Sequence, residues 1–145
     1  MYFVDREKIE VVLQYMEEQL AILEKKNNWD SPIEKLALER IAHTVVESIL
    51  DVGNAMIDGF IMRDPGSYED IIDILLDEKV VRKDMSKDLK VIVEWRKKLV
   101  QEYTTVTHTE LTETLGKVLS TLKQFPISIR HYLETELGPV SAFRN

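Results

Sequence analysis

Arg96 is the residue whose position in this sequence most strongly suggests chemistry. It lies inside the apolar stripe of a predicted helix, three residues after Val93 and three before Leu99. Burying an unpaired guanidinium group is costly, so its side chain should reach solvent, bind a carboxylate, or face a pocket or partner surface where an anion neutralises it. From this residue alone, an ion pair within the chain is the favoured interpretation, because unpaired charges are rarely buried.

A row of polar side chains on another predicted helix offers partners for Arg96. Its members follow one another by three or four positions: Arg40, His43, Glu47, Asp51, Asn54 and Asp58. Such a row usually forms the solvent-facing side of a helix. The alternative is a polar wall along the groove that Arg96 enters, in which Glu47, Asp51 or Asn54 pairs with the guanidinium group.

The same row raises the question of a metal site, since His43, Glu47 and Asp51 are each four residues apart. The Glu-x-x-His pairs of di-iron bundles are missing, and charged rows are most often solvated, so we expect no metal. No cofactor is expected either, because glycine-rich nucleotide motifs, P-loops and the common hydrolase motifs are absent. The chain has no Cys, which excludes disulfide scaffolds, thiolate metal sites and cysteine nucleophiles.

Charge is unevenly distributed along the chain. The 145 residues include 19 basic and 26 acidic side chains, for a net charge of −7. Residues 82–98 reverse this balance with seven basic and three acidic side chains, a local charge of +4. Lys90, Lys97 and Lys98 in this segment form a candidate RNA-binding patch, which needs two copies of the chain for tight phosphate binding. A solvated helix face is the simpler interpretation.

The spacing of apolar residues predicts the elements that position these side chains. Apolar positions recur by threes and fours almost throughout, which indicates helices. We expect an all-α fold, an antiparallel bundle of four long helices plus one short helix, in which residues 1–145 form a single domain. No apolar run reaches the roughly 18 residues of a membrane span, and the start of the chain lacks signal-peptide features, so a cytoplasmic protein is expected.

Capping residues predict where the helices begin. Asp5 caps the first helix, which stops near Asn27. Ser31-Pro32-Ile33-Glu34 is a capping box that opens a second helix to about Phe60, and Ser67 caps the short helix. Asp84 or Ser86 opens the fourth helix, which is expected to run to about Tyr103. A further capping box, Thr107-His108-Thr109-Glu110, opens the last helix, in which Pro126 should cause a kink or a break.

Tyr103 follows Arg96 by seven residues, which on a continuous helix places both on nearly the same face. Spacing alone therefore predicts that Tyr103 belongs to the buried stripe of the fourth helix. Its place near the helix end suggests instead that the hydroxyl group is accessible.

The segment Trp95-Arg96-Lys97-Lys98-Leu99-Val100-Gln101-Glu102-Tyr103 resembles the signature of the HepT-like family in the HEPN (higher eukaryotes and prokaryotes nucleotide-binding) superfamily. In that signature an aromatic residue and Arg are followed, after four residues, by His, any residue and Tyr. Three further segments are similar to the family: Asp51-Val52-Gly53-Asn54, Pro65-Gly66-Ser67-Tyr68 and Ile74-Leu75-Leu76. The resemblance covers about residues 5 to 130. Two positions depart from it, with Gln101 in place of the His and Lys97 in place of the usual Asn.

The resemblance implies a ribonuclease toxin that acts as a homodimer on RNA. Arg96 of both subunits would hold the scissile phosphate at the dimer interface, and Tyr103 would be the tyrosine that an MntA-type nucleotidyltransferase antitoxin modifies with AMP. Gln101 would occupy the position of the catalytic His. Glutamine has no acid or base function near neutral pH, and the loss of a general acid or base typically costs about 10² to 10⁴ in rate.

Three hypotheses follow. The first is a metal-independent endoribonuclease that is weakened or inactivated by Gln101 and is silenced by AMP on Tyr103. The second is a catalytically inactive dimer that binds nucleotide, RNA or the nucleotidyltransferase partner. The third is a purely structural bundle in which Arg96 is bound to Glu47 or Asp51 of its own chain.

Overall fold

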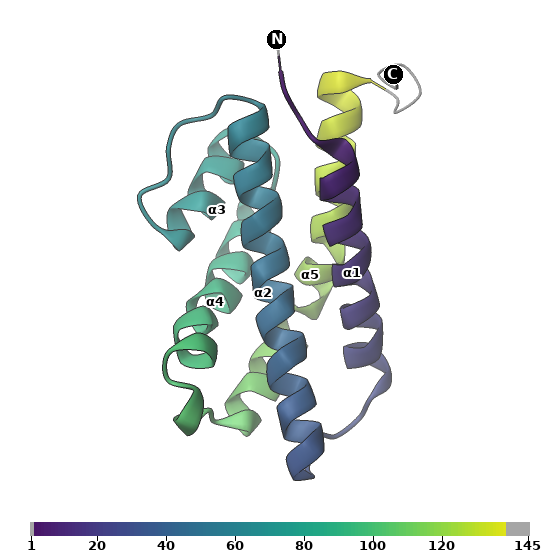
Figure 1. Cartoon of the computed structure of the whole chain (residues 1–145), viewed down its shortest axis with the longest axis vertical. Helices are drawn as coiled ribbons and strands as arrows, with labels where there is room; N and C mark the ends of the chain where they lie inside the picture. The colour runs from purple at the N-terminus through teal and green to yellow at the C-terminus, as the bar shows by residue number, and fades with distance from the viewer. Residues whose placement is uncertain (1, 139–145) are drawn as a thin grey trace.

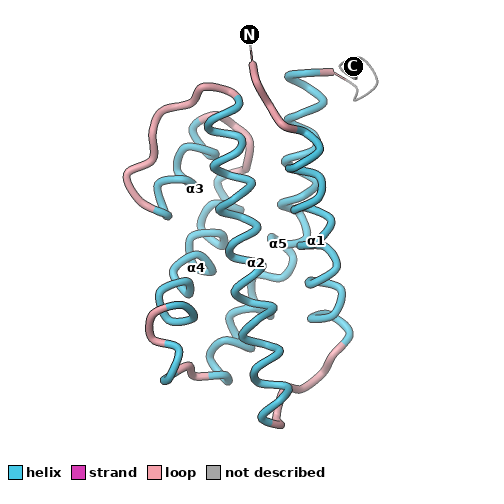
Figure 2. Tube along the Cα trace, viewed as in Figure 1, coloured by secondary structure: helices cyan, strands magenta, loops and turns pink. Residues whose placement is uncertain are grey.

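The computed structural model describes residues 2–138, which form five α-helices and one short 3₁₀ turn. The elements are α1 (Arg6–Lys25), α2 (Pro32–Gly59), α3 (Tyr68–Asp77), α4 (Lys83–Val100), the 3₁₀ turn η1 (Tyr103–Thr105) and α5 (His108–Leu137). Loops join them, and the one between α2 and α3 is extended (Figure 2). The predicted all-α bundle of four long helices and one short helix is confirmed.

Helix α2 occupies the middle of the bundle (Figure 1). α1 runs along one side of α2, while α3 and α4 follow one another along the other side, and α5 passes behind. Both ends of the described chain lie at the same end of the bundle. There Arg6 on α1 donates a hydrogen bond of 2.9 Å from Nη1 to the carbonyl oxygen of Gly138, so this contact ties the two ends together.

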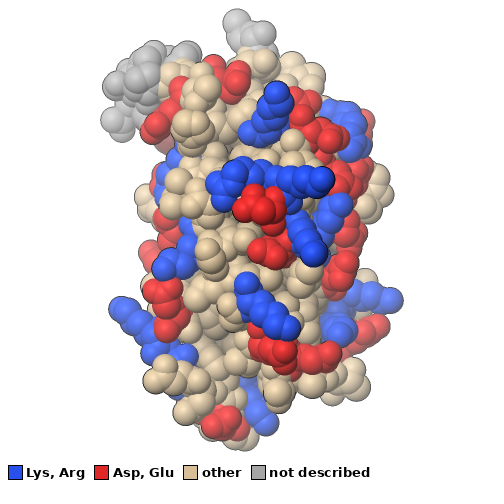
Figure 3. Space-filling model, turned by 180° about the vertical axis from the view of Figure 1, so that it is seen from behind, with Lys and Arg blue, Asp and Glu red and all other residues tan. Residues whose placement is uncertain are grey.

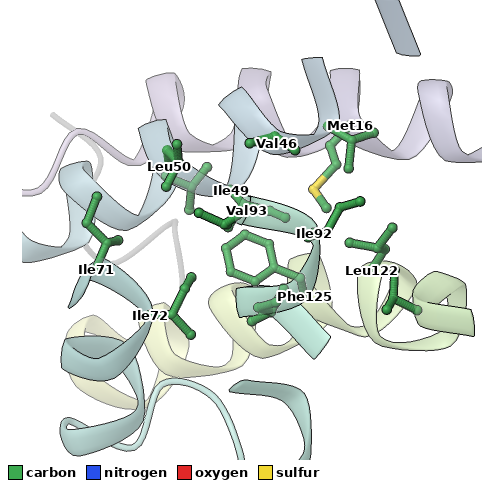
Figure 4. Packing of buried hydrophobic residues seen from close by; sticks show 14 of the residues in the cluster. Met16, Val46, Ile49, Leu50, Ile71, Ile72, Ile92, Val93, Leu122 and Phe125 are labelled. Carbon is green, nitrogen blue, oxygen red and sulfur yellow. The ribbon is translucent and has the colours of Figure 1, made fainter. Parts of the chain in front are cut away.

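The buried apolar side chains form one cluster to which all five helices contribute. Phe125 of α5 is fully buried and lies near Ile49, Ile92 and Val93 from the facing helices (Figure 4). α2 buries residues around much of its circumference, because α1, α3, α4 and α5 all contact it. Its wide apolar arc is therefore explained by a central position in the bundle.

Gly53 allows α2 and α3 to approach closely. A Cβ atom at this position would lie 2.5 Å from Cγ2 of Ile71. That methyl group sits on the branched carbon next to the α3 backbone, so it cannot move aside by a simple rotation. Gly53 therefore sets the distance of α3 from α2, and with it the place of Tyr68 at the start of α3.

The side-chain caps predicted for the first three helices are confirmed. Asp5 accepts a hydrogen bond from the Lys8 amide at 3.1 Å. Ser31 and Glu34 form both bonds of the capping box, at 3.1 and 2.9 Å. Ser67 accepts from the amide of Asp70 at 3.0 Å. These caps are local in sequence, which is why residue order alone is enough to predict them.

The predicted limits of α4 are wrong at both ends. The helix begins at Lys83 after Arg82, which makes no side-chain cap bond. Ser86 cannot cap because its hydroxyl donates to the carbonyl of Lys83. At the other end α4 stops at Val100, since the amide of Glu102 turns back to the carbonyl of Lys97. Tyr103 consequently lies beyond the helix, and the prediction that it shares one face of a continuous helix with Arg96 fails.

The capping box expected for α5 is wrong, and of the kink or break expected at Pro126 the break is wrong. Thr107 is the N-cap residue, but its side chain makes no capping bond, so the predicted capping box is not formed. Pro126 does not break the helix, which continues from His108 to Leu137. Pro126 is buried within the core-facing side of α5, and packing on both sides of it maintains the helix despite the missing amide hydrogen.

A three-residue ionic cluster joins the outer faces of α1 and α5. Arg130 donates to both carboxylates of Glu10 and Glu17 through four hydrogen bonds of 2.8 to 2.9 Å. These bonds lower the pKa of Glu10 below its ordinary value of 4.5. On the face opposite α2, basic and acidic side chains are interspersed (Figure 3), which is not the one-sign surface typical of nucleic-acid binding.

Candidate functional site

Arg96 on α4 is held by groups from two other helices. Its Nε donates a hydrogen bond of 2.6 Å to Oε1 of Glu47 on α2. Its guanidinium carbon lies 4.6 Å from the ring centre of Tyr68, the first residue of α3. The two contacts fix both an edge and a face of the guanidinium group. The predicted ion pair within the chain is present, and Glu47 is the partner among the three proposed.

The outer edge of the guanidinium group makes no hydrogen bond to the described residues. Within residues 2–138, the only hydrogen bond of the Arg96 side chain is the one from Nε. Its Nη1 and Nη2 atoms therefore make none to this part of the chain, and the side chain keeps 23% of its surface exposed. Two parallel N–H donors in a fixed plane match the oxygens of a phosphate or carboxylate group. The geometry offers an anion a preformed two-pronged donor.

Two other members of the polar row on α2, His43 and Asp51, lie near Glu47. His43 Nε2 is 3.6 Å from the Glu47 oxygen that binds Arg96. Partial desolvation and the nearby Glu47 charge raise the pKa of Asp51 above its usual value of 3.8, while Lys8 and Arg96 act against this rise. Asn54 is exposed. This row therefore carries exposed side chains and also supplies the carboxylate that binds Arg96.

The loop before α3 is braced in a way that holds Tyr68 in place. Arg63 donates two hydrogen bonds to the carboxylate of Asp70, at 2.8 and 2.9 Å. The same carboxylate accepts from the amide of Gly66 at 2.8 Å. These bonds hold the pKa of Asp70 at about 2, with the Arg63 bonds as the largest cause. A tyrosine whose backbone is this constrained can orient Arg96 at a small entropic cost.

Tyr103 and Gln101 lie at the end of α4, in the turn towards η1. Gln101 is the C-cap residue of α4 and is exposed. Tyr103 opens η1 and is 64% exposed, so the prediction that it belongs to the buried stripe is wrong and its hydroxyl group is accessible. Neither side chain forms a hydrogen bond with Arg96 in the described part of the chain. Within one chain, Arg96, Gln101 and Tyr103 therefore do not form a single site.

The three lysines of the candidate RNA-binding patch differ in their surroundings. Lys90 forms an ion pair with Asp73 on α3. Lys97 lies 3.8 Å from a carboxylate oxygen of Glu102, and the Lys98 ammonium lies 4.5 Å from the Trp95 ring centre. Lys97 and Lys98 are exposed and adjoin Arg96 in sequence. Local acidic partners thus offset part of the positive charge that the composition of this segment indicates.

Metal-binding clusters and membrane-spanning helices are both absent from the described part of the chain. Residues 2–138 contain no group of three or more His, Asp or Glu side chains placed to hold a metal ion. In the same residues, no helix is long and apolar enough to cross a membrane.

Sequence reasoning missed Tyr68 as a site residue. It lies 28 positions before Arg96 in the chain, and a contact between them depends on how α3 docks against α4, which no local pattern reveals. An aromatic residue at a strongly capped helix start is the available signal. The sequence identifies His43 only as a member of the polar row, and the structure adds its closeness to the carboxylate that holds Arg96.

Comparisons with known proteins agree on one family. The model of a family described as "Ribonuclease HepT-like" matches residues 8–129. A relative from Bacillus subtilis (strain 168), described as "Putative RNase YutE", is 55% identical over 144 residues, which cover 99% of this chain and 100% of the relative.

Solved structures give the same result. One, described as a cytosolic protein of unknown function, YutE from Bacillus subtilis, superimposes with a TM-score of 0.95 over 99% of this chain and 100% of its own, at 55% identity. A Shewanella oneidensis HEPN toxin, described as tri-AMPylated and in complex with an MNT antitoxin, matches with a TM-score of 0.73 at 16% identity, over 90% of this chain and 99% of its own. The second match shows a shared fold, and the family predicted from the sequence is confirmed.

Proposed function

Because this chain belongs to the HepT-like ribonuclease family, we propose that it is a metal-independent endoribonuclease of the toxin class. Arg96 binds the scissile phosphate. The observation that carries this proposal is the state of the guanidinium group, whose Nε is bound by Glu47 while Nη1 and Nη2 make no hydrogen bond to the described residues.

The hydrogen bond to Glu47 orders the Arg96 side chain for anion binding and does not occupy its Nη atoms. A flexible arginine loses side-chain entropy when it is immobilised on a ligand. Here the hydrogen bond to Glu47 and the stacking on Tyr68 already restrict the side chain. A phosphate that approaches the two Nη atoms forms charge-assisted bonds without this ordering cost. A purely structural role explains the bond to Glu47 but does not explain the open donor edge.

Gln101 limits the expected activity. It occupies the position of the family histidine and can donate or accept a hydrogen bond to an RNA oxygen, but it cannot transfer a proton near neutral pH. Asp51 and Asn54 extend the polar wall along the bound RNA strand. Lys97 and Lys98 contribute phosphate contacts that do not depend on RNA sequence. Gln101 also favours the second candidate function, a catalytically inactive dimer that binds nucleotide, RNA or a nucleotidyltransferase without cleavage.

We propose a homodimer in which α1 and α2 face the second copy. Lys8 lies close enough to influence Asp51, and Val11 and Tyr15 share its helix face because they follow it by three and seven residues. The side chains of Val11 and Tyr15 are 67% and 40% exposed. Leu36, which lies on α2 four residues before Arg40, is 66% exposed. Apolar side chains beside a polar site are typical of an interface.

The proposed dimer is tested by measuring molar mass in solution. Leu36→Glu and Val11→Glu should each shift the protein from dimer to monomer in light scattering coupled to size-exclusion chromatography. Ile127→Glu is the matched control, since this α5 side chain is similarly exposed, at 54%. A wild-type chain that remains monomeric at high micromolar concentration rejects the dimer.

The regulation that we propose is AMP modification of Tyr103 by an MntA-type nucleotidyltransferase. Its support is the motif position and the 64% exposure of the side chain, together with the description of the Shewanella relative as tri-AMPylated. An AMP group adds bulk and negative charge just beyond the end of the helix that carries Arg96, and this charge would repel RNA. Intact mass before and after incubation with ATP, magnesium and such an enzyme should show an AMP-sized gain, absent in Tyr103→Phe.

We further propose that residues 1–145 form one cytoplasmic domain. The support for the location is that the related YutE structure is described as that of a cytosolic protein.

Cleavage of RNA tests the proposed function. Wild type should cleave a single-stranded RNA slowly in the presence of EDTA, Arg96→Ala should lose this activity, and Gln101→His should increase it. If Arg96→Ala binds and cleaves as wild type does, Arg96 is not the phosphate ligand. If none of the three proteins cleaves but RNA binding depends on Arg96, the inactive dimer is the correct alternative.

A further inference from the structure

His43 lies at the centre of an unassigned group of side chains beside the proposed phosphate site. On α2, Glu39, His43 and Glu47 follow one another at intervals of four residues. His43 Nε2 is 3.6 Å from the Glu47 oxygen to which Arg96 Nε donates at 2.6 Å. Because both nitrogens contact the same oxygen, the imidazole and guanidinium nitrogens are at most about 6 Å apart.

The proposed reaction lacks a group that can accept a proton. Metal-independent cleavage of RNA begins when the 2′-hydroxyl loses its proton as its oxygen attacks phosphorus, and Gln101 cannot take that proton. Imidazole is the side chain best suited to this transfer at neutral pH.

Only three histidines are present in the chain, and among the described residues the other two have no contact with the Glu47 oxygen that binds Arg96. His108 Nε2 is 2.7 Å from a carboxylate oxygen of Glu39 and belongs to the start of α5. His131 lines a groove between α5 and the loop that follows α3, with Val80 and Tyr132. Within residues 2–138, neither shares a hydrogen-bond or ion-pair partner with Arg96. The His43 side chain is 31% exposed, so a bound RNA strand can reach it.

We propose that His43 is a catalytic residue of this ribonuclease, the general base that replaces the missing motif histidine. This inference rests on the proposed function. A ring nitrogen of His43 takes the proton of the 2′-hydroxyl, the O2′–P bond forms and the P–O5′ bond breaks. The 5′-oxygen takes up a proton from water, and His43 later returns its proton to solvent. The products are a 2′,3′-cyclic phosphate and a 5′-hydroxyl end, and no net charge or electron is gained or lost.

The neighbours of His43 support this role by geometry. Glu47 lies between the imidazole and Arg96, so the carboxylate that binds the proposed phosphate ligand also lies 3.6 Å from the proposed proton acceptor. Charged or titratable groups approach this region from every helix packed near it: Glu39, Arg40, Glu47 and Asp51 on α2, Lys8 on α1, Tyr68 on α3, Arg96 on α4 and His108 on α5.

Single-turnover cleavage of a short RNA in EDTA, measured from pH 5 to pH 9, tests the assignment. His43→Ala should lower the rate by about 10²- to 10⁴-fold and abolish the rise in rate over the range where imidazole loses its proton. Binding of an RNA with a 2′-deoxy nucleotide at the cleavage site should change less than about threefold. Added imidazole should restore part of the activity of His43→Ala, which a merely structural role does not predict.

His131→Gln is the control and should retain the wild-type rate and pH profile, because it removes an imidazole at a distance from Arg96. His43→Gln tests whether shape alone suffices, and circular dichroism checks that both His43 variants fold. If wild type cleaves and both His43 variants cleave at its rate with its pH profile, the inference is wrong while the proposed function stands. If wild type itself does not cleave, the proposed function fails and the role of His43 fails with it.

Discussion

Replacing Arg96 with Lys separates the geometry of the guanidinium group from its charge. In the structure Nε is bound to Glu47 while Nη1 and Nη2 are available to a ligand. A lysine keeps the positive charge but presents a single ammonium group, which must serve both Glu47 and the phosphate. It also loses the flat surface that stacks on Tyr68. We therefore expect Arg96→Lys to bind RNA more weakly although the net charge of the protein is unchanged.

The size of the loss follows from the number of bonds. Two N–H groups of the arginine can reach the phosphate, and the lysine retains one of them at most. One charge-assisted hydrogen bond contributes about 1.5 to 3 kcal/mol, which corresponds to a roughly 10- to 150-fold weaker affinity. The salt dependence should be preserved because the same number of charges meets the phosphate. Arg96→Ala, in contrast, should reduce the slope of log K against log salt concentration by about 0.7.

Fluorescence anisotropy with a labelled, 2′-deoxy-substituted RNA at several KCl concentrations measures both quantities. Circular dichroism confirms that the variants fold. If Arg96→Lys binds within twofold of wild type at every salt concentration, Arg96 acts only as a point charge and the proposed two-pronged geometry is refuted.

Three further predictions concern the scaffold around the site. Gly53→Ala should lower the free energy of unfolding by about 1 to 3 kcal/mol through overpacking. Gly116→Ala should raise the free energy of unfolding by about 0.5 to 1 kcal/mol, because the added carbon would have no neighbouring atom within 4 Å. Urea denaturation of both variants checks this. Arg130→Met should cost about 1 to 2 kcal/mol by the same measurement, because it breaks a charged but partly exposed cluster, and a change below about 0.3 kcal/mol would contradict it. Arg63→Ala should raise the pKa of Asp70 from about 2 towards 3.8 in a carbon-13 NMR titration. In wild type the stabilisation by this pair should be fully present above the unfolded-state pKa of 3.8 and should be lost progressively as the pH falls from there through about 2.

Local interactions explain why much of the fold is predictable from the sequence. The capping residues Ser31 and Ser67 act within three positions of themselves, so their order in the chain identifies them. Glu47 is one of three candidate partners for Arg96, because helical spacing narrows the choice to one row of side chains.

Non-local packing explains the failures. The end of α4 depends on a backbone turn at Glu102, and the burial predicted for Tyr103 failed with it. Pro126 is accommodated because core contacts on both sides hold the helix together. The stacking of Tyr68 on Arg96 joins two helices whose relative position no sequence period encodes.

Nitrogen-15 NMR of the arginine side chains provides the most direct test of phosphate binding by Arg96. The labelled protein is titrated with the non-cleavable RNA, and the Arg96 signals are assigned by their loss in Arg96→Ala. We predict that the Arg96 guanidinium signals shift and sharpen with saturating RNA, with smaller changes at Arg63 and Arg130. Arg96 signals that stay constant while RNA binds elsewhere would contradict the assignment of this residue as the phosphate ligand.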